Sequence, residues 1–274
     1  MPDTRAVEAL TDYLNTQLDE IAAGDAGLRR GDDPIHDTRV AIRRLRSTLR
    51  VFRKVLDGPA VGDMDDELKW FAGLLGEVRD CHVQSRRFSE ALDELPDTLV
   101  LGPVRSRIRN ELKAIELPAR TRVGEAMESE RYLALTAVLR DWRADPPVAA
   151  GLTRKQLRKR TDRARHKADK RLAEALDGGS GEMLHRARKA AKRARYAAEL
   201  CRPIDKGAKR IIKRYKHIQQ VLGDHQDAEV ATATLRRLAI AAGTTPGENG
   251  FTYGLLYARE QRIATRSREA VRGL

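Results

Sequence analysis

The chain has 274 residues, of which 41% are hydrophobic and only 4% aromatic, and its formal net charge is +13. This length allows one large domain or two of ordinary size, with a sizeable core in either case. Ala, Leu, Arg and Glu dominate while runs of β-branched residues are scarce, which favours helices over strands. The composition therefore predicts an all-α protein and argues against a sheet-based fold.

The positive charge is concentrated in one segment. Residues 151–217 contain 23 Lys and Arg against 7 Asp and Glu, so this segment contributes +16 and the remainder is close to neutral. Such a field attracts polyanions, among them nucleic acids, anionic membrane surfaces and phosphate polymers. No secretory signal and no apolar run of membrane-spanning length is found, and only Cys81 and Cys201 are present. We therefore expect a cytoplasmic protein without a membrane partner.

Apolar residues at spacings of three and four predict helices along the whole chain. We expect the first helix at 3–23, ended by Gly24 and Gly27. The second helix should begin after Asp33, which is a plausible N-cap residue, and should reach Asp57.

The remaining helices are separated by Gly and Pro signals. They are expected at 60–75, 76–94, from 97 onward, 129–143, 153–176, 180–202, 203–222, 224–241 and 248–272. Within this series, Leu75-Gly76 marks either a break or a tight approach, and Gly223 marks a second break. Asp145-Pro146-Pro147 is the predicted boundary between two helical halves, 1–145 and 151–274, of a single domain, 1–274.

Two segments far apart in the chain share one arrangement of basic residues. The segment 36–53 begins His-x-x-Arg-x-x-x-Arg-Arg-x-Arg, and the same spacing of His and basic residues starts again at His185. A second pair of segments, 75–83 and 222–230, also matches and follows each His-containing helix at nearly the same distance. Two collinear matches predict an internal duplication.

Helical spacing places the basic residues of both copies on one face of their helices, at about 100° per residue. The two stripes consist of His36, Arg39, Arg43, Arg46 and Arg50 in the first copy and His185, Arg188, Lys192 and Arg195 in the second. Like charges at successive turns repel each other, so an anion is expected to offset them. The alternative is a solvated face paired with neighbouring acids. Arg44 and Arg193 point away from the stripes and are weaker candidates.

Two further helices carry basic stripes, which are Arg154, Arg158 and Arg165 on one and Lys206, Lys209, Lys213 and Lys216 on the other. Helices with one basic and one apolar stripe would line a groove or channel when they pack as a bundle. Arg binds phosphate oxygens with two parallel hydrogen bonds and Lys acts as a point charge, so such a channel suits a ligand with repeated phosphates. We expect the first two stripes to face each other across this path, with Arg39, Arg43 and Arg46 opposite Arg188, Lys192 and Arg195.

The histidines and carboxylates show no recognisable metal or catalytic pattern. His36 and His185 have no second His or Cys three or four residues away, and neighbouring Arg residues would repel a cation. These two histidines either donate hydrogen bonds to phosphate or serve as packing residues. Asp224, His225 and Asp227 could suggest metal or acid–base chemistry, but a structural role near the Gly is favoured. Because no phosphate loop or nucleophile elbow appears, we expect the protein to have no catalytic activity, no cofactor and no bound metal.

The duplicated His/Arg segments resemble the CHAD domain, named for its histidine-containing α-helical architecture, and the resemblance extends over residues 3–272. It implies two pseudo-symmetric four-helix bundles with a basic central pore or groove. It also implies binding of inorganic polyphosphate, often in bacteria and sometimes on polyphosphate granules. Gln226 stands where the first copy has Arg79, so the symmetry of the pore is not expected to be strict.

Stripes and resemblance together predict a non-catalytic polyphosphate-binding protein. The expected binding residues are His36, Arg39, Arg43, Arg46, Arg50, Lys69, Arg154, Arg158, His185, Arg188, Lys192, Arg195, Lys209, Lys213 and Lys216. The alternatives are a basic helical protein that binds nucleic acid and an enzyme that processes polyphosphate. Only Tyr196 and Tyr215 lie near the stripes for stacking on bases, which disfavours nucleic acid.

Overall fold

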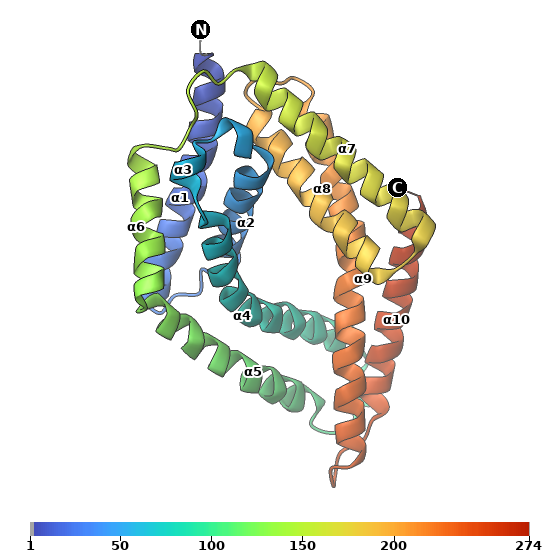
Figure 1. Ribbon diagram of the computed structural model, residues 1–274. Helices are drawn as coiled ribbons and strands as arrows, with labels where there is room; N and C mark the ends of the chain where they lie inside the picture. Colours follow the sequence, from blue (N-terminus) through green and yellow to red (C-terminus); the bar gives the residue numbers. More distant parts are fainter. Residues whose placement is uncertain (1–2, 274) are drawn as a thin grey trace. The chain divides into compact units, whose positions relative to one another are not determined.

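The computed structural model describes residues 3–273, which form ten α-helices and two short 3₁₀ helices (Figure 1). The elements are α1 Thr4–Arg29, α2 Ile35–Val51, η1 Arg53–Val55, α3 Gly58–Val61, α4 Met64–Asp93, η2 Asp97–Leu99, α5 Val104–Met127, α6 Glu130–Ala144, α7 Arg154–Gly178, α8 Gly181–Cys201, α9 Ala208–Gly243 and α10 Phe251–Arg272. The predicted all-α class is confirmed. Within residues 3–273, none of the helices is long and apolar enough to cross a membrane.

The chain divides into two compact units. The first unit contains the chain up to Gly76 together with Thr121–Gln219, and the second contains Glu77–Arg120 together with the chain from Gln220 onward. The chain passes between the units inside α4, α5 and α9, and the passages in α4 and α9 lie close to the second pair of matching sequence segments. Each predicted half therefore contributes to both units, and the duplication itself stays a prediction.

Nearly all of the net charge belongs to the first unit. It contains 38 Lys and Arg against 26 Asp and Glu, a balance of +12, whereas the second unit contains 15 against 14, a balance of +1. A polyanion is therefore attracted mainly to the first unit.

In the first unit, α1 packs along α2, α7 packs along α8, and α2 also contacts α8. Figure 1 shows α7 and α8 lying side by side over most of their length. Buried alanines on α8 permit this close approach, and they are Ala187, Ala190, Ala191, Ala194, Ala197 and Ala198. The alanine face of α8 thus leaves its other faces to carry arginines.

The first helix is longer than the sequence predicted. Helix α1 does not end at Gly24 or Gly27 but continues to Arg29. A Cβ atom at position 24 would overlap the Thr38 side chain of α2, and one at position 27 would lie 3.0 Å from Cγ of Pro34. These glycines therefore permit the close approach of α1 and α2.

Helix α2 is also shorter than expected. Its N-cap residue is Pro34 and not Asp33, because the carbonyl of Pro34 accepts the first helical hydrogen bond, from the amide of Thr38 at 3.0 Å. The helix ends at Val51 and not at Asp57, because a 3₁₀ turn follows and the amide of Asp57 bonds to the carbonyl of Pro147 at 3.0 Å.

The breaks expected at Gly76 and Gly223 do not exist, because α4 and α9 run through these positions as continuous helices. At Gly76 the guanidinium of Arg39 occupies the place that a Cβ atom would take. The alternative reading of Leu75-Gly76 as a tight approach is therefore confirmed. Gly inside a helix costs up to about 1 kcal/mol relative to Ala, so the contact with Arg39 must offset that cost.

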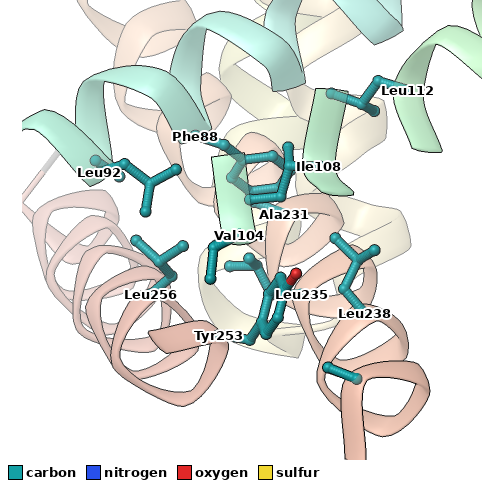
Figure 2. Packing of buried hydrophobic residues seen from close by; sticks show 12 residues of the cluster. Phe88, Leu92, Val104, Ile108, Leu112, Ala231, Leu235, Leu238, Tyr253 and Leu256 are labelled. Atoms are coloured by element: carbon teal, nitrogen blue, oxygen red, sulfur yellow. The ribbon is translucent and has the colours of Figure 1, made fainter. Parts of the chain in front are cut away.

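The second unit has a compact apolar core of its own (Figure 2). Its side chains come from four helical segments, with Phe88 and Leu92 on α4, Val104, Ile108 and Leu112 on α5, Ala231, Leu235 and Leu238 on α9, and Tyr253 and Leu256 on α10. Glu260 of α10 is 1% exposed and accepts a hydrogen bond of 2.8 Å from Arg87 Nε. This unit is thus held by an apolar core and by the ion pair of the buried Glu260 with Arg87.

Candidate anion-binding site

Every binding residue predicted from the sequence lies in the first unit. Two helices, α2 and α8, carry most of them and contact each other, so the two stripes belong to neighbouring elements. His36 is the second residue of α2 and is exposed, as expected for the first turn. The face-to-face arrangement of the two stripes stays a prediction.

Tyr196 on α8 is the point where arginines of both copies meet. The Nε atom of Arg43 donates to the Tyr196 hydroxyl at 3.1 Å. The guanidinium groups of Arg44 and Arg195 lie 5.6 and 4.8 Å from the centre of its ring, within the range of cation–π attraction. Three cations are thereby held around one aromatic side chain.

Glu199 is the carboxylate that partly neutralises this group. It pairs with Arg44 at 3.2 Å and with Arg195 at 3.3 Å, and it accepts the Tyr13 hydroxyl at 3.3 Å. Burial, and then the negative charge of Glu199, raise the pKa of Tyr13 well above its usual value, so Tyr13 remains a neutral donor. With three arginines against one glutamate, the cluster retains a net positive charge.

Arg39, Arg46 and Arg50 of the same stripe contact α4. Arg39 donates to the carbonyl of Ala72 beside Gly76. Arg46 donates from Nε to Oδ1 of Asp65 at 3.0 Å, and Arg50 donates from Nε to Oδ2 of the same carboxylate at 2.7 Å. The first stripe is thus fixed at one point to α8 and at three points to α4.

A surface cavity of about 400 Å³ opens where α2, α4, α7 and α8 come together. Its charged lining residues are Arg50, Asp65, Arg160, Arg163, Lys167 and Arg193. Five cations therefore surround one carboxylate. Among residues 3–273, no carboxylate forms an ion pair with Arg160, Arg163, Lys167 or Arg193, whereas Arg50 is paired with Asp65.

The surroundings of Arg193 in this cavity disfavour its positive charge. Burial, followed by the positive charges of Arg50 and Arg171, lowers the pKa of Arg193, while the nearby Asp65 acts in the opposite direction. A lowered pKa means that the folded protein disfavours the charged form of this side chain. A bound anion would relieve that cost, so the cavity favours a negatively charged ligand.

The cavity changes the ranking of residues made from the sequence. Arg193 was expected to be a weak candidate because it points away from its stripe, and Arg160, Arg163 and Lys167 were missed. The spacing of residues 160, 163, 167 and 171 puts them on one face of α7, opposite the predicted stripe. This second periodicity in α7 was the signal that could have found them.

The predicted stripe of α7 is largely engaged within the protein. Arg154 pairs with Asp3, Arg158 donates from Nη2 to the carbonyl of Ile204 at 2.6 Å, and Arg165 pairs with Asp162 at 3.1 Å. These contacts match the alternative of a paired basic face for this stripe. By contrast, Lys69, Lys209, Lys213 and Lys216 are exposed, and no ion pair holds them within the described part of the chain.

The two tyrosines nearest the stripes are not available for stacking. Tyr196 and Tyr215 are each 1% exposed. The hydroxyl of Tyr215 donates to Oδ1 of Asp169 at 2.8 Å, and burial together with this carboxylate raises its pKa to about 12. Neither ring can therefore receive a base without unfolding its surroundings.

Asp224, His225 and Asp227, which could suggest metal or acid–base chemistry, lie in the second unit. Asp224 lines a cavity of about 230 Å³ together with Arg87, Arg259 and Arg266, while His225 is buried. Within residues 3–273, no group of three or more His, Cys, Asp or Glu side chains is arranged to hold a metal ion. Both cysteines are buried and free.

Comparison with known proteins agrees with these features. Residues 12–236 match the profile of the CHAD domain. Two curated proteins of Mycobacterium tuberculosis, "Uncharacterized protein Rv2226" from strain H37Rv and "Uncharacterized protein MT2285" from strain CDC 1551, are 33% identical over 267 residues, or 93% of this chain. The chain spans 50% of the length of each of these relatives.

Solved structures show the same fold. The structure named "PptA from Streptomyces chartreusis" has a TM-score of 0.78 and 22% identity, and the match covers 97% of both chains. The CHAD domain of the plant Ricinus communis has a TM-score of 0.76 and 27% identity, over 98% of this chain and 90% of that chain. These findings confirm the resemblance noticed in the sequence, and the chain belongs to the CHAD domain family.

Proposed function

We propose that this protein binds inorganic polyphosphate without processing it, on the cationic surface formed by α2, α4, α7 and α8 of the first unit. The observation that carries this proposal is the cavity lined by five cations and one carboxylate, in a unit of charge +12. Membership of the CHAD family, which is associated with polyphosphate, points to the same ligand.

The chemistry of the cavity suits a phosphate polymer better than a single anion. Guanidinium groups hold phosphate oxygens through two parallel hydrogen bonds, and Lys167 adds a point charge. Arg50 belongs both to the cavity and to the stripe of α2, so a chain of phosphates in the cavity can continue along that helix. We infer that the ligand runs from the cavity along the stripes.

The finer parts of the proposal come from the family resemblance and from the sequence repeats. We propose two pseudo-symmetric four-helix bundles with a basic central pore, a cytoplasmic location and an association with polyphosphate granules. The proposed ligand residues on α2 and α8 are His36, Arg39, Arg43, Arg46, Arg50, His185, Arg188, Lys192 and Arg195.

Nucleic acid is the competing polyanion, and the aromatic side chains argue against it. Single-stranded nucleic acids gain about 1–3 kcal/mol per base from stacking on aromatic rings. The rings of Tyr196 and Tyr215 are buried, and the first of them is covered by Arg44 and Arg195. The two rings nearest the stripes are therefore not available for stacking, which fits polyphosphate better than single-stranded nucleic acid.

The proposal is tested by equilibrium titration with phosphate chains of increasing length at constant total phosphate. Affinity should increase with chain length and decrease steeply with salt, because each neutralised phosphate releases counterions. Long polyphosphate should also displace single-stranded DNA or RNA of equal charge. If orthophosphate bound as well as the long chain, or if nucleic acid displaced polyphosphate, the proposed ligand would be wrong.

A further inference from the structure

Asp65 differs from the other residues of the cationic cavity in the sign of its charge. It is the single carboxylate among the lining residues within the described part of the chain. Its side chain is 26% exposed, and its two oxygens accept hydrogen bonds from Arg46 at 3.0 Å and from Arg50 at 2.7 Å. Asp65 thus engages Arg50, which lines the cavity, and Arg46, which lies one turn earlier on α2.

A carboxylate and a phosphate group compete for the same kind of partner. Both present oxygens that a guanidinium group binds with charge-assisted hydrogen bonds. A phosphate group can therefore bind Arg46 and Arg50 fully only when the Asp65 carboxylate leaves them. We infer that Asp65 sets the minimum length of the ligand, because its carboxylate occupies a position that a phosphate group would otherwise take. This inference rests on the proposed function.

The dependence on length follows from where ligands of different size can bind. A short oligophosphate that fits inside the cavity makes all of its contacts there, so competition from the Asp65 carboxylate affects a large share of them. A long chain also contacts the stripes of α2 and α8, and it can bind there while Asp65 stays in place. Asp65 therefore weakens the binding of short ligands more than the binding of long ones.

A simpler role for Asp65 is to stabilise the start of α4, where acidic residues interact favourably with the helix dipole. Asp66 and Glu67 lie in the same first turn and can serve that purpose equally well. Glu67 pairs with Arg131 at 2.6 Å, and Asp66 is exposed and does not line the cavity. Asp66 is therefore a matched control, since its replacement removes the same charge from the same helix turn.

The test compares Asp65→Asn and Asp66→Asn with the wild-type protein, using tripolyphosphate and long-chain polyphosphate as ligands in calorimetric titrations. Loss of a competing charge-assisted pair should tighten the binding of tripolyphosphate about tenfold or more. The binding of the long chain should tighten by less than about threefold, since most of its contacts are elsewhere. Asp66→Asn should leave both affinities unchanged.

Three outcomes separate the inference from the function on which it rests. If Asp65→Asn leaves the affinity for tripolyphosphate unchanged, or shifts both ligands equally, Asp65 does not select length even though polyphosphate binds. If the wild-type protein binds neither ligand, the proposed function fails and the inference fails with it. Should Asp65→Asn unfold, Asp65→Ser replaces it, because a serine suits the start of a helix and carries no charge. The same thresholds apply to that variant.

Discussion

Arg43 on α2 donates a hydrogen bond of 3.1 Å from its Nε atom to the hydroxyl of Tyr196 on α8. This bond joins the two helices that carry the duplicated basic motifs. Because the tyrosine ring also lies beneath Arg44 and Arg195, one buried side chain organises arginines from both copies.

Tyr196→Phe should destabilise the protein by about 1–2 kcal/mol, because a buried hydrogen bond to a charged donor is lost while the ring is kept. The free energy of unfolding in urea measures this change. Tyr257→Phe is the control, since the exposed Tyr257 hydroxyl accepts a hydrogen bond of 3.1 Å from Gln261 and has no other hydrogen bond among residues 3–273. The control should change stability by less than about 0.5 kcal/mol. Equal effects in the two variants would show that Arg43 does not depend on the tyrosine hydroxyl.

Gly24→Ala should destabilise the protein by about 1–3 kcal/mol, because the new Cβ atom overlaps the Thr38 side chain and forces α1 away from α2. Gly73→Ala in α4 is the matched control, because nothing lies within 4 Å of the added methyl group. Its better helix propensity should increase stability by up to about 1 kcal/mol. Thermal melting shows whether each substitution raises or lowers the melting temperature. An increase for Gly24→Ala would refute the close approach of α1 and α2.

Those two glycines also show what local sequence signals can and cannot specify. The composition predicted the all-α class. The apolar periodicity predicted the positions of most helices, because it reflects which side of each helix is buried. It could not distinguish a glycine that ends a helix from one that admits a neighbour, since that depends on a residue far away in the sequence. Gly24 and Gly76 lie within continuous helices and admit the side chains of Thr38 and Arg39.

The candidate site was predictable only in part. The stripe of α2 follows from spacing alone, and in the structure Arg43 contacts α8 while Arg46 and Arg50 contact α4. The cavity depends on which face of α7 meets α8, and this was not apparent from the charge pattern because α7 is basic on more than one face. Arg193 was therefore undervalued until the packing of α7 against α8 was known.

Arg193→Gln should weaken the binding of polyphosphate about tenfold while leaving the protein as stable as before or slightly more stable. The second effect is expected because burial and neighbouring cations lower the pKa of Arg193, so its charge destabilises the folded state. Titration with polyphosphate and urea unfolding measure the two effects.

The control for this variant is Arg186→Gln on the same helix. Arg186 is exposed, pairs with Glu182 one turn away and does not line the cavity. Its replacement should leave polyphosphate affinity within about twofold of the wild type. If Arg193→Gln lowered stability and left binding intact, Arg193 would be a structural cation and not a ligand residue.

Neither thiol should react in the folded protein at mildly alkaline pH. Burial raises the pKa of Cys201 to about 11, and burial also raises the pKa of Cys81, so little thiolate is present and access is poor. A chromogenic thiol reagent at about pH 8 should detect no fast-reacting group before denaturant is added and both groups afterwards. Rapid reaction of a native thiol would mean that its helix opens readily.

The most direct test of the account is a charge reversal in the cavity, Arg163→Glu with Lys167→Glu, compared with Arg236→Glu and Arg262→Glu in the second unit. All four side chains are exposed, and both double variants change the net charge equally. The cavity variant should lose more than about tenfold in affinity for long polyphosphate, and the control less than about threefold. Equal losses would contradict the account, because binding would then depend on net charge and not on the cavity.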